Sequence, residues 1–463
     1  MSIKCFRNNE KTMDDLQLEL QNARSGEVDL DTRLDKTSAQ LADIAVNVKN
    51  FKCTDGTYVV GNGVHDDTSG IQAAMDTGHR VFIPSGTYLV KNLIPHGGQI
   101  VYGENAVDSW GSATATFKTI LKGIGTTADY VIKNRTWDTD GSPYSVHIHD
   151  LTIDGNSKAT NGIQCGNSTV IERCKIINCI DGIYKIDVSR VTNCQISANT
   201  NGIHEAVDSK IDGNFIYNND VGINFYNSND NIISNNKIEW NGIGISLDTA
   251  VFNLIIGNIF DRSTTYGIYS NSTAYITVVN NQFERNLTNH VFVRGSYWNL
   301  SGNSFFQKNS MDDLSGTMVP TNAITLDSAA NSTFCNNMVY GTKMFNATYS
   351  SVSNNTFNNN SINGLSDYIL SVTIPSTVIA AGGNSTLQIA FPSTYAANGY
   401  DIKLHGYKLS TAEDTNVNYY QYNGVEIYIH NANGIYIKIT NNYAVSKTFS
   451  GIILLEHTQW SKR

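Results

Sequence analysis

Hydrophobic and polar residues recur with a period of about 22 residues through the middle of this chain. One repeat is a polar residue, usually Asn, followed two positions later by Ile or Phe. Its copies are Cys174-Lys175-Ile176, Cys194-Gln195-Ile196, Asn214-Phe215-Ile216, Asn236-Lys237-Ile238, Asn258-Ile259-Phe260, Asn281-Gln282-Phe283 and Asn303-Ser304-Phe305. A second repeat, a Gly-Ile pair, keeps step with it at Gly162, Gly182, Gly202, Gly222, Gly244 and Gly267. A unit this short, rich in Ile, Val, Asn and Gly, predicts short strands joined by turns, as in a parallel β-helix.

Each turn of such a solenoid pairs its backbone with the next turn, roughly 4.8 Å away, so equivalent side chains stack in columns. The isoleucines of the Gly-Ile pairs are therefore predicted to form one buried column, and the Ile and Phe residues of the other repeat a second. Asn tolerates left-handed backbone at a tight bend and offers its amide to neighbouring backbone. Because the Asn column persists along the coil, we interpret it as scaffold and not as chemistry.

Composition narrows the possible partners. The chain has 463 residues, a net charge of -9 and only 16% charged residues. This charge argues against a duplex nucleic-acid partner, which needs a basic stripe. No run of some twenty apolar residues exists, so no membrane insertion is expected, and Met1 to Glu10 lacks the apolar centre of a secretory signal peptide.

The seven cysteines are interpreted as reduced residues and not as a disulfide framework. Cys174 and Cys194 occupy equivalent positions in successive units, where small apolar side chains fit the core. No cofactor is expected, and no spacing resembles a zinc site. His147 and His149 face one side of a predicted strand near Asp150 and Asp154, and we interpret this as a surface strand and not as a metal site.

A specific motif precedes the repeats. It comprises Gly61-Asn62-Gly63-Val64-His65-Asp66-Asp67-Thr68, then Ile71-Gln72-Ala73-Ala74, then Val81-Phe82-Ile83-Pro84-Ser85-Gly86-Thr87-Tyr88. The motif resembles the first coil of the pectate-lyase-like right-handed β-helix superfamily, which includes tailspike depolymerases, although Asn62 stands where the family usually carries Asp. Physically, Asp67 or Thr68 can cap a following helix, and Pro84-Ser85-Gly86 can turn the chain back into a strand. This block is predicted to close the open end of the solenoid.

The first 50 residues differ in composition from the rest. Leu34, Leu41 and Val48 fall seven apart with Ile44 between them, which predicts a short heptad seam. The stretch from Asn22 to Asp35 resembles the adaptor region of bacteriophage tail-fibre and baseplate proteins of Gram-positive hosts. That resemblance implies a homotrimer, held on phage tail or baseplate proteins in the virion, that acts at the host cell surface.

The repeat stops after Asn355-Thr356-Phe357, and strand-like alternation follows, for example in Val425-Glu426-Ile427-Tyr428-Ile429. This pattern predicts a separate antiparallel β-sandwich that serves trimerisation, carbohydrate binding or both. The predicted fold is thus all-β, a right-handed single-stranded parallel β-helix with an N-terminal helical segment and a C-terminal sandwich. The predicted domains are residues 1–50, 51–367 with a cap at 51–100, and 368–463.

Candidate chemistry appears three residues past each Asn of the first repeat. The column there reads Ile177, Ser197, Tyr217, Glu239, Asp261, Glu284 and Phe306. Three consecutive units carry carboxylates, and the units on either side do not. The next position adds Trp240, Arg262 and Arg285. We therefore predict Glu239, Asp261 and Glu284 as catalytic residues, and Trp240, Arg262, Arg285 and Tyr217 as substrate-binding residues.

Paired carboxyl groups suit glycoside hydrolysis. One acts as acid and the other as nucleophile or base, with separations of about 5 to 5.5 Å for retention and 6.5 to 9.5 Å for inversion. Crowded carboxylates raise one another's pKa, while neighbouring Arg residues keep an acid ionised. The alternative interpretation is a solvated ion-pair ladder between the same acids and Arg262 and Arg285, without activity.

A second candidate site follows the Gly-Ile repeat and comprises Tyr184, Lys185, His204, Glu205 and Asp208. A polysaccharide lyase needs a base such as Lys, Tyr or His and a cation to neutralise a uronate. A structural ion pair between Lys185 and Glu205 is the simpler interpretation of their equivalent positions. Resemblance to pectate lyases would also allow calcium at the clustered Asp residues, although no compact liganding motif supports it.

The sequence as a whole predicts a tailspike-type depolymerase that hydrolyses a host cell-surface polysaccharide with outward carboxylates. The alternatives are a polysaccharide lyase on the same fold and a non-catalytic spike that recognises surface glycan.

Overall fold

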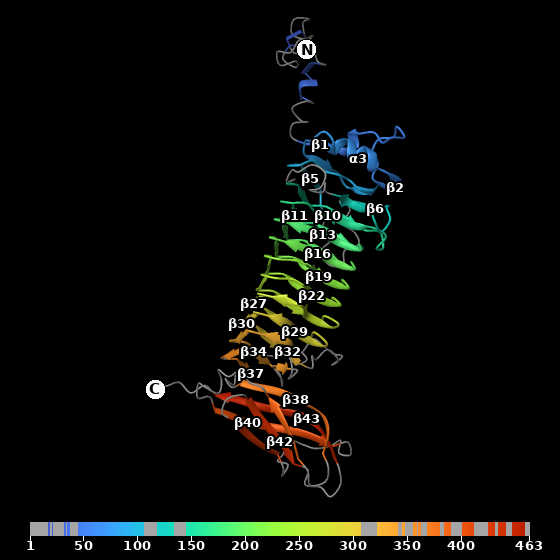
Figure 1. The fold of residues 1–463 in the computed structure, drawn as a ribbon. Coiled ribbons are helices and arrows are strands. Elements are labelled where there is room, and N and C mark those ends of the chain that lie inside the picture. Colours follow the sequence, from blue (N-terminus) through green and yellow to red (C-terminus); the bar gives the residue numbers. More distant parts are fainter. Residues whose placement is uncertain are drawn as a thin grey trace, which may run out of the picture.

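A computed structural model describes residues 45–105, 118–133, 145–306 and 322–340, together with isolated residues before this range and mainly strands after it. The chain winds into a parallel β-helix whose turns stack along one axis, with the N-terminal cap at one end and the C-terminal strands at the other (Figure 1). Each regular turn contributes one strand to each of three sheets, in the order sheet 1, sheet 2, sheet 3.

The three sheets run the length of the solenoid. Sheet 1 contains β1 (Val46–Asn47), β3 (Val81–Ile83), β5 (Ile100–Gly103), β8 (His147–His149), β11 (Val170–Glu172), β14 (Arg190–Thr192), β17 (Lys210–Asp212), β20 (Ile232–Ser234), β23 (Leu254–Ile256), β27 (Thr277–Val279), β30 (Asn299–Ser301), β33 (Thr333–Cys335) and β36 (Thr356–Asn358). Sheet 2 contains β2 (Asn62–Asp66), β4 (Gly86–Val90), β6 (Thr119–Gly123), β9 (Thr152–Asp154), β12 (Lys175–Ile177), β15 (Gln195–Ser197), β18 (Phe215–Tyr217), β21 (Lys237–Glu239), β24 (Ile259–Asp261), β28 (Gln282–Glu284), β31 (Ser304–Phe306), β34 (Met338–Tyr340) and β37 (Ser361–Ile362). Sheet 3 contains β7 (Tyr130–Lys133), β10 (Asn161–Gln164), β13 (Asp181–Asp187), β16 (Asn201–Val207), β19 (Val221–Tyr226), β22 (Ile243–Asp248), β25 (Tyr266–Asn271), β29 (Asn289–Ser296), β32 (Asn322–Ala330), β35 (Phe345–Ala347) and β38 (Tyr368–Ile379), with β26 (Thr273–Ala274) paired to β29.

The predicted aliphatic columns are confirmed. Ile163, Ile183 and Ile203 are in register and buried. In the second column Ile238 pairs with Phe260, and the Phe260 and Phe283 rings stack at 4.7 Å. Full burial of each such side chain stabilises the fold by roughly 1.5 to 3 kcal/mol. The glycine before each isoleucine follows from close packing: a Cβ on Gly202 would lie 2.4 Å from the carbonyl oxygen of Gly222.

The Asn column is also confirmed, with one correction. Asn236, for example, donates its backbone N–H and its side-chain N–H to Asn258 Oδ1 at 2.9 and 3.0 Å. We call the residues of this column, such as Asn236 and Asn258, the ladder residues. The left-handed residue, however, is the one before each of them, such as Asn235 with φ 56° or Gly257 with φ 67°. The ladder side chain is directed inward instead, because a buried amide satisfies backbone groups on two turns at once.

Each turn has three corners, and a left-handed residue marks each corner along most of the solenoid. Corner 1 joins sheet 1 to sheet 2, corner 2 joins sheet 2 to sheet 3, and corner 3 joins sheet 3 to the next strand of sheet 1. Cys174 and Cys194 occupy the ladder position after corner 1 and are free and buried, as predicted. Their thiols donate to backbone carbonyls, which is how a small side chain replaces Asn there.

The N-terminal cap is built around helix α3 (Thr68–Met75). The predicted capping differs in detail: Asp67 is the N-cap but its carboxylate accepts from the N–H groups of Val60 and Gly61. Asp66 Oδ1 accepts from the Thr68 N–H instead. The predicted return to strand at Pro84-Ser85-Gly86 is confirmed by β4.

The solenoid begins slightly before the predicted boundary at residue 51. β1 already pairs with β3, and Val48, in the short 3₁₀ helix η1 (Val48–Asn50), is fully buried in the core. Val48 therefore packs in the solenoid and not in a heptad seam. Leu34, Leu41 and Ile44 lie outside the described residues.

At the C-terminal end, sheet 3 continues into antiparallel strands in the order β38, β43 (Lys447–Thr458), β40 (Asp401–Thr411). A second antiparallel sheet has the order β39 (Asn384–Ile389), β42 (Gly434–Thr440), β41 (Val425–His430). The predicted antiparallel strands are thus present, and their packing as a sandwich stays a prediction. Among the helices that the structure describes, none is long and apolar enough to cross a membrane.

Candidate active site

The three predicted carboxylates lie side by side on sheet 2. Tyr217 pairs with Glu239, Glu239 with Asp261, and Asp261 with Glu284. Each is the third residue of a three-residue strand whose middle residue is buried in the core, for example Ile238 in β21. Alternation along a strand therefore directs these side chains to the outer face of the solenoid.

Three of the four predicted substrate-binding residues occupy corner 2, and the fourth, Tyr217, ends β18 in the carboxylate column itself. Trp240, Arg262 and Arg285 follow the three carboxylates and have φ values of 52°, 51° and 48°. The same left-handed conformation occurs at Asn178, Ala198 and Asn218 on earlier turns. It is therefore the geometry of the corner, and it places each of these side chains at the edge of the carboxylate column.

Asp261 is the centre of an ion-pair network. Arg285 donates to it twice, from Nε to Oδ1 at 2.8 Å and from Nη2 to Oδ2 at 2.6 Å. Arg262 Nη1 donates to Oδ2 at 3.0 Å, and Arg285 Nη2 also contacts Glu284 Oε2 at 3.1 Å. Asp261 and Arg285 are only 4% and 5% exposed. The ion pairs of the alternative interpretation are thus present, but they are buried rather than solvated.

Glu239 lies in a different environment from Asp261. It is 1% exposed, and Lys237 Nζ contacts its Oε2 at 3.0 Å. No group among the described residues hydrogen-bonds to its Oε1, which is also buried. Burial raises the pKa of Glu239, with Lys237 opposing the shift. An acid with a raised pKa and an unpaired oxygen is a candidate proton donor.

The pKa of Asp261 is raised as well, again chiefly by burial, although Arg285 and Arg262 oppose the shift. Its two oxygens nevertheless accept three hydrogen bonds from guanidinium groups, so their lone pairs are largely engaged. This leaves Asp261 suited to hold Arg262 and Arg285 in place rather than to attack a substrate.

The aromatic residues near the column are partly engaged by their neighbours. The guanidinium carbon of Arg262 lies 5.5 Å from the centre of the Trp240 ring, in a cation–π contact. The Tyr217 ring stacks on Phe215 at 4.3 Å. Arg262 covers one face of the Trp240 ring, so at most the other face can contact a sugar.

The second predicted site is assembled on β13 and β16. Tyr184 pairs with His204 in register, and their rings lie 5.4 Å apart. Lys185 Nζ approaches Glu205 Oε2 at 3.9 Å, which is the ion pair expected from their equivalent positions. His204 Nδ1 lies 3.1 Å from an oxygen of Asp181, a residue that the sequence analysis missed.

Asp181 makes His204 cationic more readily. Burial lowers the pKa of His204, but Asp181 and Glu205 together outweigh it and the net shift is upward. Asp181 also accepts from Asn201 Nδ2 at 2.7 Å. It stands one residue before the Gly-Ile pair, and a search of that outward position on each turn would have found it.

Asp208 does not join this cluster. It lies around the next bend, at corner 3 with φ 49°, and borders a surface depression together with Ser209 and Lys210. Left-handed Glu205 and Asp208 are separated by only two residues, so the chain turns twice between them. Asp208 is close to Glu205 in sequence, which predicted that it belongs to this cluster, but the second bend directs it away.

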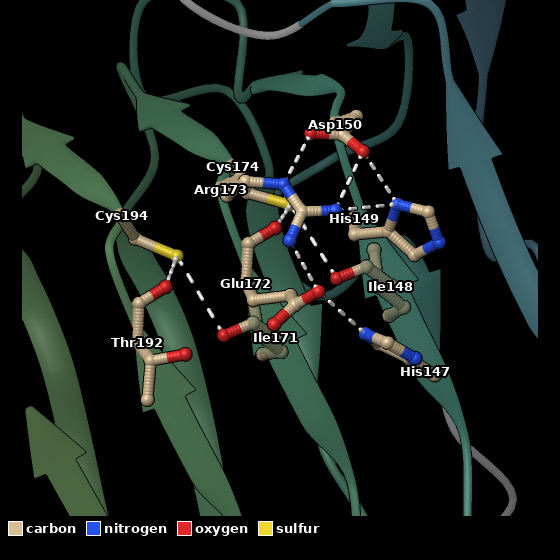
Figure 2. A network of polar contacts seen from close by, with 10 residues as sticks. All are labelled: His147, Ile148, His149, Asp150, Ile171, Glu172, Arg173, Cys174, Thr192 and Cys194. Atoms are coloured by element: carbon tan, nitrogen blue, oxygen red, sulfur yellow. Dashed lines mark hydrogen bonds and ion pairs between the residues drawn. The ribbon is translucent and has the colours of Figure 1, made fainter.

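His147 and His149 lie on sheet 1, as the surface strand predicted for them (Figure 2). Figure 2 shows Arg173 between Asp150 and Glu172: its Nε and Nη2 donate to Asp150 at 2.8 Å each, and its Nη1 contacts Glu172 Oε1. His149 Nδ1 contacts Asp150 Oδ2 at 2.7 Å. A guanidinium group occupies the position that a cation would need.

One cluster among the described residues has metal-ligand spacing, namely Cys53, His65 and Asp67 in the N-terminal cap. The Asp67 carboxylate already accepts from two backbone N–H groups and from His65 at 2.8 Å. Burial raises the pKa of the Cys53 thiol, which disfavours the thiolate that a metal needs. These contacts make the cluster a structural part of the cap.

Comparison with known proteins identifies the type of β-helix. Residues 161–310 match the family model described as the right-handed β-helix region. The solenoid is accordingly a right-handed β-helix of the pectate-lyase-like type, as the cap motif suggested.

Mannuronan C5-epimerase AlgE5 of Azotobacter vinelandii is 30% identical over 266 residues, which is 50% of this chain and 24% of that protein. This chain thus spans about a quarter of the length of the curated relatives it matches. Among solved structures, the A-module of mannuronan C-5 epimerase AlgE4 from the same organism has a TM-score of 0.55 at 18% identity and covers 69% of this chain and 96% of that module.

A protein of Geobacillus virus E2, ORF18, has a TM-score of 0.52 at 17% identity. Its similarity covers 92% of this chain and 80% of the viral protein. At this identity the likeness shows the fold alone, although it extends well beyond the solenoid.

Proposed function

We propose that this chain is a tailspike-type depolymerase of a bacteriophage, which hydrolyses glycosidic bonds in a host cell-surface polysaccharide. The observation that carries the proposal is the pairing of two unlike acids in one column: Glu239 is buried, has a raised pKa and has no hydrogen bond to its Oε1 from the described residues, while Glu284 is more exposed and contacts Arg285 at 3.1 Å. Acid-catalysed cleavage of a glycoside needs such a division between a protonated and an ionised carboxyl group.

We propose a role for each acid from its contacts. Glu239 donates its proton to the glycosidic oxygen as the bond from that oxygen to the anomeric carbon breaks. Glu284, the most exposed of the three, takes a proton from the water that attacks the anomeric carbon. Asp261 is a positioning residue that fixes Arg285, which in turn contacts Glu284. The net reaction adds one water across the bond.

The register favours inversion of configuration. Glu239 and Glu284 are separated by one strand, so their backbones lie about 9.6 Å apart, twice the spacing of neighbouring strands. That backbone separation is close to the carboxyl spacing of inverting glycosidases, about 6.5 to 9.5 Å, and well above the roughly 5 to 5.5 Å of retaining ones. Lys237 must leave Glu239 Oε2 when a substrate binds, and its exposed side chain can do so without moving the strand.

The test is to incubate the wild type and Glu239→Gln with surface glycans from candidate Gram-positive hosts, and to follow reducing ends and the anomer released. We expect the wild type to release reducing ends of inverted configuration, and the variant to fold, bind glycan and release none. Reducing-end release by the variant at the wild-type rate would refute the role of Glu239. Retention of configuration would refute the pairing with Glu284.

The viral assignment is supported by the similarity to ORF18 of Geobacillus virus E2 across 92% of this chain. We propose accordingly a homotrimer attached to phage tail or baseplate proteins in the virion through residues 1–50, with residues 368–463 as a C-terminal sandwich. A monomeric mass in light scattering would remove the trimer from the proposal.

A second enzymatic function is favoured by one observation, the sequence similarity to proteins named mannuronan C5-epimerases. Inversion at C5 of a uronate begins with removal of the C5 proton, and elimination begins in the same way but then expels the C4 substituent. The cluster of Tyr184, Lys185 and His204 has suitable groups. Against it stand Asp181 and Glu205, whose carboxylates oppose the binding of an anionic uronate.

Product analysis separates these functions. Absorbance from an unsaturated uronate, lost in His204→Gln, would indicate elimination, and proton exchange at C5 without chain cleavage would indicate epimerisation. Saturable glycan binding with none of these products would indicate the non-catalytic recognition spike.

A further inference from the structure

Three exposed aromatic rings form a stack on corner 3. Phe252, Tyr275 and Tyr297 occupy the corner on consecutive turns and are 53%, 46% and 47% exposed. The Phe252 and Tyr275 rings are 4.7 Å apart at 10°, and the Tyr275 and Tyr297 rings are 4.7 Å apart at 4°. Since the residues are one turn apart, the stack runs along the solenoid axis.

The backbone conformation makes this stack costly. All three residues have left-handed φ values, between 55° and 60°. Bulky side chains disfavour this region, at a cost of order 1 to 3 kcal/mol each, whereas Asn and Asp tolerate it. Asp208 and Asp230 occupy the same corner on earlier turns, and Asn331 on a later one. Val188 holds the corner on a still earlier turn, and among the described turns aromatic residues occupy it on three consecutive ones, as expected for a local binding feature.

The stack is one wall of a groove. A depression of about 430 Å³ is lined by the three rings together with Leu254 and Thr277 from the outer face of sheet 1. A second depression of about 430 Å³ lies along the preceding turns of the same corner. Its lining is mixed: Val170, Val188 and Ile232 lie beside the polar residues Arg190, Lys210, Asp208, Asp230 and Ser209.

The two depressions adjoin in line. Ile232 in the second is the register partner of Leu254 in the first. Asp230 precedes Phe252 at the corner, and its N–H donates to Val251. Tyr275 covers one face of Phe252, so the other face is directed toward the turn of Asp230, where the two depressions meet. We infer that the two form one groove parallel to the axis, with the charged residues in its first half, called the polar half, and the aromatic residues in its second.

We propose that this groove is a second, non-catalytic binding site for a linear polysaccharide, on the premise that the chain acts on such a glycan. Aromatic rings pack against the apolar faces of sugars, and hydroxyl and charged side chains pair with sugar hydroxyls. The two basic and two acidic residues in the polar half give it no strong net charge, which suits a hydroxyl-rich ligand. Corner 3 is opposite sheet 2 in the three-sided coil, so the groove is separate from Glu239 and its neighbours.

A second copy of this chain is the competing occupant. The apolar core of a subunit interface is depleted in charged residues. Arg190, Lys210, Asp208 and Asp230 in one half of the groove do not fit that pattern. The elongated shape and the mixed lining favour a glycan.

The test is affinity electrophoresis of the full chain in gels cast with each polysaccharide of the cleavage screen, mannuronan among them, in a Glu239→Gln background that cannot cut the gel matrix. The variant Phe252→Asn/Tyr275→Asn/Tyr297→Asn places at the corner a residue that the corner already uses at Asn331. We expect unchanged or increased thermal stability and at least a tenfold loss of affinity. Tyr58→Ser, which removes a 54% exposed ring from the cap, should leave retardation unchanged.

Several outcomes would overturn the inference. The first is that the gels retard the triple variant as strongly as its parent. The second is that no gel retards either chain. The third is that the substitutions change the molecular mass in light scattering but leave glycan binding unchanged. The last would identify a subunit contact. If glycan binding depends on the three rings but the wild type cleaves no glycan, the proposed hydrolysis is refuted, whereas the proposed binding site in the groove is supported.

Discussion

Two columns of side chains flank sheet 2. The inner one lies inside the coil just after corner 1, and the outer one lies on the outer face just before corner 2. The inner column, from Asn214 through Asn258 to Asn303, repeats the same hydrogen bonds on every turn. The outer column changes chemistry from turn to turn, and its acids are consecutive only at Glu239, Asp261 and Glu284. Each inner residue must satisfy the same buried backbone groups, so the residue type repeats. The outer residues carry no such requirement, so their type can vary and a functional site can form there.

The outer column is nevertheless not a solvated surface. Asp261 and the adjacent Arg285 are nearly as buried as the asparagines of the inner column, and Glu239 is more buried than either. Burying charges is costly unless they are paired, and an unpaired carboxyl group shifts its pKa instead. Burial raises the pKa of both acids, but two guanidinium groups hold Asp261 in place, whereas Glu239 contacts only the exposed Lys237 among the described cations.

The largest effect is expected for Asn258→Ala in the inner column. Asn258 Oδ1 accepts from the backbone and side chain of Asn236, and its Nδ2 donates to Ile233 O at 2.9 Å. Several buried groups lose their partners at about 1 to 3 kcal/mol each, so we expect roughly 5 kcal/mol of destabilisation in denaturant unfolding. Asn235→Gly, at the corner position just before Asn236 on the preceding turn, should change stability by less than about 1 kcal/mol, because Gly257 already occupies the equivalent position. Equal effects at both positions would contradict the assignment of the ladder.

The next largest effect is expected for Arg285→Ala in the outer column. Removing this partner leaves Asp261 buried with only Arg262, which should destabilise the chain by about 3 to 5 kcal/mol. The double variant with Asp261→Asn should recover part of that loss, since no charge then stays unpaired. A double-mutant cycle from urea unfolding measures the coupling, and additive losses would show that the pair contributes little.

A smaller energetic effect, but a selective one, is expected for Glu239→Gln. Loss of the proton donor should reduce polysaccharide cleavage at least 100-fold, equivalent to about 2.7 kcal/mol of barrier. Stability should change by less than about 1 kcal/mol, because Gln keeps the shape of the side chain. Initial rates of reducing-end release check the first part and unfolding checks the second. A loss of stability as large as that for Arg285→Ala would make Glu239 part of the scaffold.

The smallest effect is expected in the pH dependence of stability. Because burial raises the folded-state pKa of Glu239 above its ordinary value, the folded chain binds this proton more tightly than the unfolded chain. The stability that this proton contributes is present below the ordinary pKa and is lost as pH rises through the folded one. Glu239→Gln should therefore flatten the unfolding free energy against pH in that window. A slope identical in both chains would show that Glu239 is ionised throughout. Cleavage by the wild type should fall over the same window, as the acid loses its proton.

Much of the solenoid was predictable because its period is a local property repeated many times. Ile163, Ile183 and Ile203 must stack once the chain coils, and the phase of the repeat placed Glu239, Asp261 and Glu284 on adjacent strands. The equivalent positions of Lys185 and Glu205 likewise predicted their ion pair.

Other features could not be read from spacing. Asp208 is close to Glu205 in sequence, yet two left-handed residues direct the chain to a different corner. Asp181, partner of His204, carries no motif of its own. The groove on corner 3 escaped notice because its aromatic residues lie at bends, where the repeat predicts no side-chain direction.

The sequence by itself determined the coil, its columns and which residues share a column, because backbone pairing at a fixed period leaves one register that buries every isoleucine. Only the tertiary structure decided which outward residues are covered and by what. Burial of Glu239, the engagement of Asp261 by two guanidinium groups and the joining of two depressions along corner 3 depend on contacts between turns and across corners. Such contacts depend on the volume and direction of side chains, which the period leaves free.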